Sequence, residues 1–264
     1  MQFARLNDVL IHYEDREAGG VPALVFANSL GTDFRIWDAV LARLQTPLRI
    51  LRYDMRGHGL SDLGRPPYRM EDHVGDLIAL LDARGIRGAI LCGLSVGGMV
   101  AQGLAGARPD LLRGLILSDT GHRIGTAEMW NTRIAAVEAG GVEAIGDAVM
   151  ERWFTADYRR RQPEALALWR NMLVRTPTGG YAGTSAAIRD ADLTEAARGI
   201  RLPTLCICGD QDIATPPELV RSLAALVSGA TFREIPGSGH LPCIEQAEVV
   251  AGLIDGFCRA HGRG

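Results

Sequence analysis

Residues 93–98 read Gly-Leu-Ser-Val-Gly-Gly, so that Ser95 stands between glycines on both sides. An apolar run at residues 89–92 precedes this stretch, and a helical pattern at residues 98–107 follows it. A G-x-S-x-G pattern between a strand and a helix is typical of a nucleophilic serine on a sharp turn. Glycines suit such a turn because they let strand and helix approach closely and leave the hydroxyl accessible. The alternative is that Ser95 is an ordinary serine in a turn. Such a serine would not need a strand directly before it and a helix directly after it.

A serine nucleophile needs a histidine base and an acid that orients the histidine. Among the six histidines of the chain, His240 lies in a glycine-flanked loop, Gly-Ser-Gly-His at 237–240, after the last expected strand. We therefore expect His240 to be the base. His12, His73 and His261 are expected to be structural or exposed.

The acid should lie between the serine and the histidine in the chain. The loop Gly-Asp-Gln-Asp at 209–212 follows a strand-like run and offers Asp210 and Asp212. One of these aspartates could instead cap the helix that starts near Pro217, since Asp is favoured in such turns. Asp119, after another expected strand, is a further candidate.

Short strand-like runs alternate with amphipathic helical patterns along most of the chain. Near-continuous apolar strands separated by such helices indicate an α/β fold with a mainly parallel sheet covered on both faces. We expect strands at residues 9–13, 23–27, 49–53, 89–92, 115–117, 204–208 and 231–235, and a closing helix near residues 249–257.

The alternation stops between residues 123 and 192, where helical periodicity continues without a strand. Gly140-Gly141, Pro163 and residues 177–180 divide this stretch into about four helices. We therefore expect a core made of residues 1–122 and 193–264, with residues 123–192 inserted as a helical cap. Ligands of open α/β sheets bind beyond the carboxyl ends of the strands, and such a cap would roof that crevice.

The composition favours a small-molecule partner. The chain has 264 residues, of which 47% are hydrophobic and 22% charged, and this suits one globular core with an insertion. A net charge of -3 without a basic, aromatic-rich stripe gives no electrostatic support for binding nucleic acid. The first residues do not resemble a signal peptide, and no apolar stretch approaches the roughly 20 residues of a membrane span. We expect a cytoplasmic protein with no membrane association.

Two residue types exclude other chemistries. All 28 basic residues are arginine, which excludes a Schiff-base lysine and a Ser/Lys dyad. The five cysteines form no CxxC pair, which argues against a disulfide framework and a structural zinc site. We expect the cysteines to serve packing, and we expect no metal site.

Together these motifs resemble the α/β-hydrolase family. Besides the serine turn, the chain has Asp-Met-Arg-Gly-His-Gly-Leu-Ser-Asp at 54–62, Gly-Asp-Gln-Asp at 209–212 and Gly-Ser-Gly-His-Leu-Pro at 237–242. In this resemblance the last residue of Gly-Asp-Gln-Asp is the acid, which implies a triad of Ser95, Asp212 and His240. It also implies an oxyanion hole formed by the backbone N–H groups of Leu30 and Val96. Many family members have His-Gly where this chain has Asn28-Ser29-Leu30-Gly31, but a backbone donor survives a change of side chain.

Within the family the chain is similar to the 3-oxoadipate enol-lactonases. This similarity rests on Asn-Ser-Leu-Gly-Thr-Asp at 28–33, the residues around Ser95 at 92–102, Arg-Trp-Phe-Thr-Ala-Asp-Tyr-Arg at 152–159 and Ala-Ala-Ile-Arg-Asp-Ala-Asp-Leu at 186–193. It implies a serine hydrolase of the β-ketoadipate pathway of aromatic catabolism. This enzyme would open an enol-lactone through an acyl-enzyme, without a metal or an organic cofactor.

The implied substrate carries a free carboxylate, which a guanidinium group can bind through two hydrogen bonds. The candidates are Arg133, close to Trp130 on the first cap helix, and Arg189. Each could instead be solvated or paired, and Trp153 could line the pocket or belong to the core.

Other activities share this serine turn. The fold and triad would also suit a carboxylesterase, a carbon–carbon bond hydrolase or a cofactor-free perhydrolase. A receptor for a small molecule with slow turnover is a further alternative, and the sequence leaves the oligomeric state open.

Overall fold

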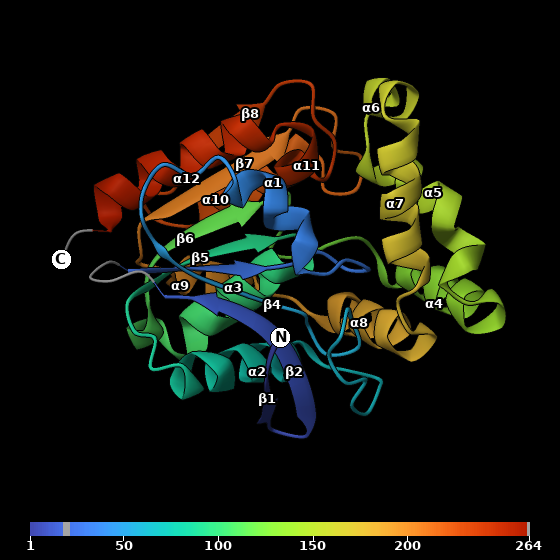
Figure 1. Ribbon diagram of the computed structural model, residues 1–264, viewed down its shortest axis with the longest axis horizontal. Helices are drawn as coiled ribbons and strands as arrows, with labels where there is room; N and C mark the ends of the chain where they lie inside the picture. Colours follow the sequence, from blue (N-terminus) through green and yellow to red (C-terminus); the bar gives the residue numbers. More distant parts are fainter. Residues whose placement is uncertain (18–21, 263–264) are drawn as a thin grey trace.

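The computed structural model describes residues 1–17 and 22–262 (Figure 1). In these residues the strands form one sheet in the order β1-β2-β4-β3-β5-β6-β7-β8. Strands β4, β3, β5, β6, β7 and β8 run parallel to one another, whereas β2 pairs with both β1 and β4 in antiparallel register. The strands are β1 (Gln2–Leu6), β2 (Val9–Arg16), β3 (Ala23–Ala27), β4 (Arg49–Tyr53), β5 (Ala89–Leu94), β6 (Leu112–Ser118), β7 (Thr204–Gly209) and β8 (Thr231–Ile235).

Helices cover both faces of this sheet. Helix α1 packs against α11 and α12, whereas α2 packs against α3, which contacts α9. Figure 1 shows these two groups on opposite sides of the strands. The helices of the core are α1 (Asp38–Leu41), α2 (Met70–Ala83), α3 (Val96–Ala107), α9 (Thr194–Gly199), α10 (Pro217–Leu226), α11 (Pro242–Glu245) and α12 (Ala247–His261).

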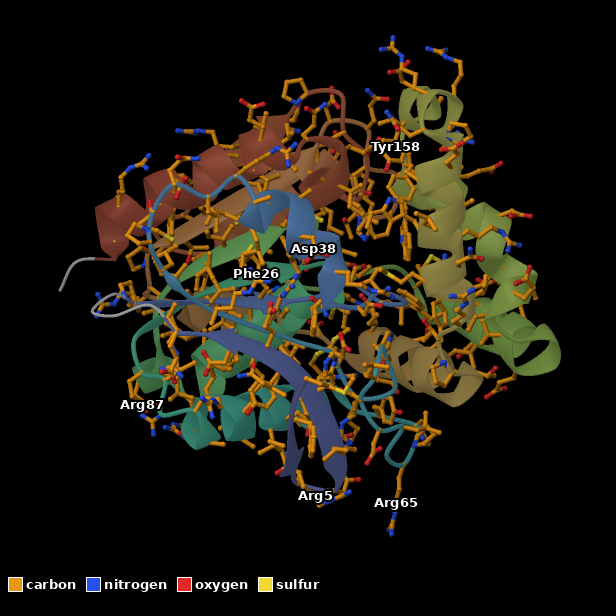
Figure 2. All side chains as sticks on the ribbon, viewed as in Figure 1. Arg5, Phe26, Asp38, Arg65, Arg87 and Tyr158 are labelled. Carbon is orange, nitrogen blue, oxygen red and sulfur yellow. The ribbon has the colours of Figure 1, made fainter. Side chains whose placement is uncertain are left out.

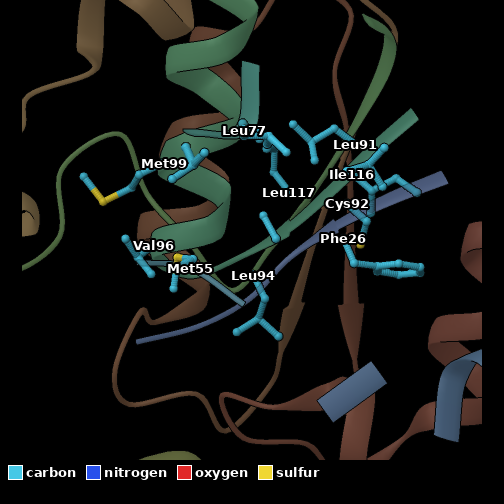
Figure 3. Close-up of a cluster of buried hydrophobic side chains, with 14 of the residues drawn as sticks. Phe26, Met55, Leu77, Leu91, Cys92, Leu94, Val96, Met99, Ile116 and Leu117 are labelled. Atoms are coloured by element: carbon cyan, nitrogen blue, oxygen red, sulfur yellow. The ribbon is translucent and has the colours of Figure 1, made fainter. Parts of the chain in front are cut away.

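The central strands are apolar because both of their faces are covered. Every residue of β3, β5 and β7 is buried, while β2 alternates between buried and half-buried positions. Figure 3 shows side chains of β5, such as Leu91, among those of the neighbouring strands and of α3. At the periphery the labelled arginines Arg5, Arg65 and Arg87 project outward, whereas Phe26 of β3 is fully buried (Figure 2). The doubly covered, mainly parallel sheet predicted from the sequence is therefore confirmed.

The strands match the expected runs, with one addition. Strand β1 was not expected, because its Gln-Phe-Ala-Arg-Leu sequence has no continuous apolar run and most of its residues are exposed or half-buried. It is an edge strand that pairs with β2 alone. Such a strand needs little apolar surface, and hydrophobic patterns detect it poorly.

Helices α4 to α8, here called the α4–α8 segment, fall between β6 and β7 and gather at one end of the sheet (Figure 1). They are α4 (Ala127–Gly140), α5 (Gly146–Trp153), α6 (Ala156–Arg161), α7 (Pro163–Val174) and α8 (Thr178–Asp190). About four helices were expected in this stretch. The additional boundary comes from Thr155, whose side chain caps α6 by accepting a hydrogen bond from the N–H of Tyr158. No proline or glycine marks that boundary.

Glycines let the α4–α8 segment approach the core closely. Gly180 lies in the first turn of α8, and a Cβ there would overlap the backbone of Gly57 in the core.

None of the helices described is both long enough and apolar enough to cross a membrane.

Candidate active site

Ser95 occupies strained backbone at the end of β5. Its φ of 57° and ψ of -118° lie outside the regions that ordinary residues prefer, and the residue is the N-cap of α3. Hydrogen bonds hold it in place: its N–H donates to the carbonyl of Ser118 at 3.0 Å, and its own carbonyl accepts from the Thr120 hydroxyl at 2.6 Å. Strain of this kind persists only where the surroundings enforce it, and it marks candidate functional residues.

The glycines around Ser95 are required by close backbone approach. A Cβ on Gly93 would overlap the carbonyl of Gly97, and a Cβ on Gly97 would overlap the carbonyl of Ala27 in β3. Since these neighbours are backbone atoms, no side-chain movement can relieve either clash. The glycines therefore let α3 start directly against the strand ends.

His240 and Asp212 meet beyond the strand ends. Nδ1 of His240 lies 2.9 Å from Oδ2 of Asp212, and both side chains are almost fully buried. The ionised carboxylate can only accept, so Nδ1 carries the hydrogen and Nε2 is left to act as a base. The backbone N–H of His240 donates to the carbonyl of Trp153 at 2.9 Å, which connects the histidine loop to the α4–α8 segment.

The loop after β7 holds the Asp212 carboxylate with several further donors. It accepts from the N–H groups of Ala214 at 2.7 Å and Thr215 at 3.1 Å, and from the Thr215 hydroxyl at 2.6 Å. Burial by itself would raise the pKa of Asp212, but the charge of His240 and these hydrogen bonds together lower it. Asp212 is therefore ionised, and its carboxylate holds the imidazole of His240 through Nδ1.

The other candidates for base and acid lie elsewhere. His12 pairs with Asp54 at 2.8 Å, His73 is buried within α2 and His261 is exposed near the end of α12. Asp210 is exposed and accepts from the N–H of Ser238 rather than contacting His240.

Asp119 lies close to Asp212. The ligand atoms of Asp119, Cys208 and Asp212 are within 4.8 Å of one another. This group suits a metal ion poorly, because Asp212 is occupied by the donors above and burial raises the pKa of the Cys208 thiol. The five cysteines are all buried and free.

The N–H groups of Leu30 and Val96 are available to a ligand. In the described part of the chain neither donates a hydrogen bond to a protein atom. The Asn28 side chain anchors the loop that carries Leu30: its amide donates to the Tyr53 carbonyl at 2.7 Å and its oxygen accepts from the Trp37 indole at 2.9 Å. Asn28 thus fixes this loop where many family members have His-Gly.

One cavity brings these groups together. Ser95, Leu30 and His240 line it, with Thr215 from the acid loop. The α4–α8 segment contributes Trp130, Arg133, Arg152, Trp153, Tyr181 and Ile188 to the same lining. The α4–α8 segment and the loops at the strand ends therefore line the same cavity.

The structure does not bring Arg189 into this cavity. Its guanidinium binds the carboxylate of Asp190, at 2.7 Å through both Nε and Nη2, and donates to Asn131. It serves to join α8 to α4 on the outside of the segment.

Arg152 is a pocket residue that sequence reasoning missed. It precedes Trp153 at the end of α5. The only feature of the sequence that could have indicated a pocket position for Arg152 was this neighbouring tryptophan, which also lines the cavity. Burial lowers the pKa of Arg152, and the nearby charge of Arg133 lowers it further. In the described part of the chain neither arginine forms a salt bridge with a carboxylate: Arg152 donates only to the Ile213 carbonyl, and Arg133 stacks over Trp130.

Comparison with known proteins agrees with this architecture. The model of the Alpha/beta hydrolase family matches residues 24–253. A protein of Acinetobacter baylyi named 3-oxoadipate enol-lactonase 2 is 33% identical over 242 residues, which cover 92% of this chain and 90% of that protein.

Solved structures are similar over almost the whole chain. The enol-lactonase from Burkholderia xenovorans superposes with a TM-score of 0.94 at 39% identity, covering 98% of this chain and 100% of that one. A thermophilic esterase from Thermogutta terrifontis, solved with malate bound, has a TM-score of 0.93 at 28% identity and full coverage of both chains. Since the family model spans most of the sequence and the fold is shared throughout, the chain belongs to the alpha/beta hydrolase family.

Proposed function

We propose that the protein is a serine hydrolase that opens the ring of a carboxylate-bearing enol-lactone through an acyl-enzyme. Ser95 Oγ attacks the ring carbonyl while Nε2 of His240 takes its proton, and Asp212 stabilises the imidazolium that forms. The N–H groups of Leu30 and Val96 bind the negatively charged oxygen of the tetrahedral intermediate. Neither N–H group donates to a protein atom within residues 1–17 and 22–262, which supports this role.

The leaving group needs little assistance in this reaction. When the intermediate collapses, the ring C–O bond breaks and the departing enolate oxygen takes the proton from His240. The resulting enol converts to a ketone. Water, deprotonated by His240, then attacks the acyl-enzyme and releases Ser95 and a carboxylic acid. The residues of the α4–α8 segment in the cavity support the proposal that residues 123–192 act as a cap over this reaction.

The pair of guanidinium groups in the cavity is the observation that carries the choice of substrate. Arg133 and Arg152 share a lining with Ser95 and His240, and neither is neutralised by a carboxylate in the described residues. Two unpaired cations inside a partly closed pocket favour an anionic ligand. The Acinetobacter relative is named 3-oxoadipate enol-lactonase 2 and the Burkholderia structure is an enol-lactonase, and the first of these names supplies the specific candidate, 3-oxoadipate enol-lactone. Under this proposal the reaction would be a step of aromatic catabolism.

A comparison of two lactones tests this choice. We expect kcat/KM to be about 10-fold to 100-fold higher for the carboxylate-bearing lactone than for its methyl ester, because charged hydrogen bonds contribute about 1.5–3 kcal/mol. The substitutions Arg133→Met and Arg152→Met should each remove most of this preference. Arg189→Met, which alters an arginine outside the cavity, serves as the matched control and should preserve it. Equal rates on both lactones would instead favour a carboxylesterase of broad specificity.

A further inference from the structure

Asp119 is a buried carboxyl group that the proposed mechanism does not use. It follows β6 directly, its exposed fraction is 0%, and its φ of 47° lies in the left-handed region. Its Oδ1 accepts from the N–H of Gly209, the last residue of β7, at 2.8 Å. Its Oδ2 lies 2.6 Å from the Ser118 hydroxyl.

Among the residues that the structure describes, the surroundings of Asp119 contain negative charge and no compensating cation. Asp212 is the nearest carboxylate, and its ligand oxygen lies within 4.8 Å. The other titratable groups that face Asp119 are thiols: Cys208 of β7, Cys92 of β5 and Cys243 of α11. No arginine or histidine forms a salt bridge with Asp119 in the residues that the structure describes.

Two adjacent, buried carboxylates without a cation between them cannot both be charged at acceptable free energy. Their hydrogen bonds decide which one stays ionised. Asp212 accepts from two backbone N–H groups, a hydroxyl and the imidazole. Asp119 has one backbone donor and a hydroxyl that can equally accept. The negative charge therefore belongs on Asp212.

We propose that Asp119 is a positioning residue for Asp212. Asp119 keeps its own proton at neutral pH and donates it in a hydrogen bond to Asp212. Its other oxygen binds the end of β7, from which the Asp212 loop starts. The site then presents a single negative charge to His240. Burial and the charge of Asp212 raise the pKa of Asp119 well above its usual range, in agreement with this assignment.

The proposal predicts how stability depends on pH, and this test needs no substrate. A carboxyl group whose pKa is raised in the folded protein destabilises the fold increasingly as the pH rises. Above about pH 4 the unfolded chain releases this proton freely, whereas the folded protein still holds it. Asp119→Asn removes this penalty. Its amide can keep the hydrogen bonds to Gly209 and Asp212, and asparagine tolerates a positive φ.

We therefore expect the urea midpoint of the Asp119→Asn variant to increase relative to wild type as the pH rises from 4 to 8. Asp255→Asn is the matched control. Asp255 is also buried, but hydrogen bonds from the N–H groups of Gln45 and Thr46 overcome its burial and lower its pKa. Its variant should differ from wild type by a nearly constant amount over the same range, because a lowered pKa places the pH dependence of Asp255 below about pH 4. A pH-independent difference for Asp119→Asn would overturn the proposal.

The proposal rests on the proposed function only in assigning Asp212 as the triad acid, and enzyme kinetics test that part. The acidic limb of the kcat/KM profile should stay in place in Asp119→Asn, which retains a neutral donor. It should shift to higher pH in Asp119→Ala, which loses that donor to Asp212. A shift to lower pH in Asp119→Asn would mean that a second negative charge had been removed, which contradicts a protonated Asp119.

A spectroscopic measurement on the wild-type protein covers the case in which neither variant folds. At neutral pH the infrared spectrum should contain the C=O band of a protonated aspartic acid, identified by its shift on labelling with ¹³C-aspartate. Absence of such a band would overturn the proposal even if the enzyme hydrolyses the lactone. Conversely, the band and the stability trend would stand if the lactone were not the substrate.

Discussion

Thr215 connects the two downstream members of the proposed triad. Its hydroxyl donates to Asp212 Oδ2 at 2.6 Å and lies 3.2 Å from Nδ1 of His240, and the side chain also faces the cavity. A hydroxyl in this position restricts the carboxylate to the orientation that the imidazole needs.

Replacing Thr215 by valine keeps the shape of the side chain and removes the hydroxyl. We expect kcat/KM to fall about 10-fold to 100-fold, because a hydrogen bond to a charged group contributes about 1.5–3 kcal/mol. Thr215→Ser should restore most of the rate, since it restores the hydroxyl. Steady-state kinetics on one ester substrate measures both variants, and an equal loss in valine and serine variants would speak against this role.

Single residues differ in how well sequence alone predicts them. Ser95, Asp212 and His240 lie in short glycine-containing loops after strands, where chain order and local pattern both indicate their positions. Arg152 has no such pattern: it is one of 28 arginines, and only the packing of α5 turns it toward Ser95 rather than toward solvent. The same limit applies to Arg189, which pairs with its own neighbour Asp190.

Among the structural elements, the junction between β5 and α3 leaves no room for a Cβ at either of its glycines, Gly93 and Gly97. The clash that a Cβ on Gly97 would make involves the backbone of β3, the strand beside β5. Relief of the clash would require α3 to move away from the sheet and would displace Ser95.

Gly97→Ala should therefore abolish turnover and lower the free energy of unfolding by about 2 kcal/mol or more, as overpacking does in close-packed interiors. Gly252→Ala in α12 is the matched control. It has open space around its Cβ position, and the change should stabilise the protein by about 0.5–1 kcal/mol through helix propensity. Urea unfolding with activity assays measures both. An active, stable Gly97→Ala variant would show that the junction has room for a Cβ at residue 97.

Elements with strong periodicity could be predicted from the sequence, and short or edge elements could not. The apolar run of β3 sets its boundaries in full, because that strand is covered on both faces. Strand β1 and helix α6 bury few side chains, and they depend on pairing with β2 and on the Thr155 cap. Tertiary context determines such elements, and that context is not visible in local patterns.

For the molecule as a whole, buried histidines make the fold sensitive to acid. The exposed fraction of His73 is 1%, and within the described residues neither ring nitrogen has a hydrogen-bond partner. Burial lowers the pKa of His73 to about 3, helped by the charges of His58 and Arg56. Burial also lowers the pKa of His58.

When the pKa of a histidine is lower in the folded protein than in the unfolded chain, a fall in pH protonates the histidine of the unfolded chain first. The free energy of unfolding should thus decrease by about 1.4 kcal/mol per pH unit for each such histidine, starting near pH 6.5 and continuing down to the folded pKa. His73→Leu removes one of these contributions and should flatten the decline, whereas His261→Gln, at an exposed position, should not. Urea unfolding at pH 7, 6 and 5 compares the slopes, and identical slopes in wild type and His73→Leu would disprove the assignment.

We propose that the serine on the β5–α3 turn opens an enol-lactone. The most direct test follows the absorbance of 3-oxoadipate enol-lactone after adding purified wild-type protein or its Ser95→Ala variant. We predict many turnovers by the wild type, and a loss of kcat/KM on the order of 10⁴-fold or more in the variant with an unchanged urea midpoint. Full turnover by Ser95→Ala would exclude Ser95 as the nucleophile, and no consumption of the lactone by the wild type would exclude the lactone as the substrate.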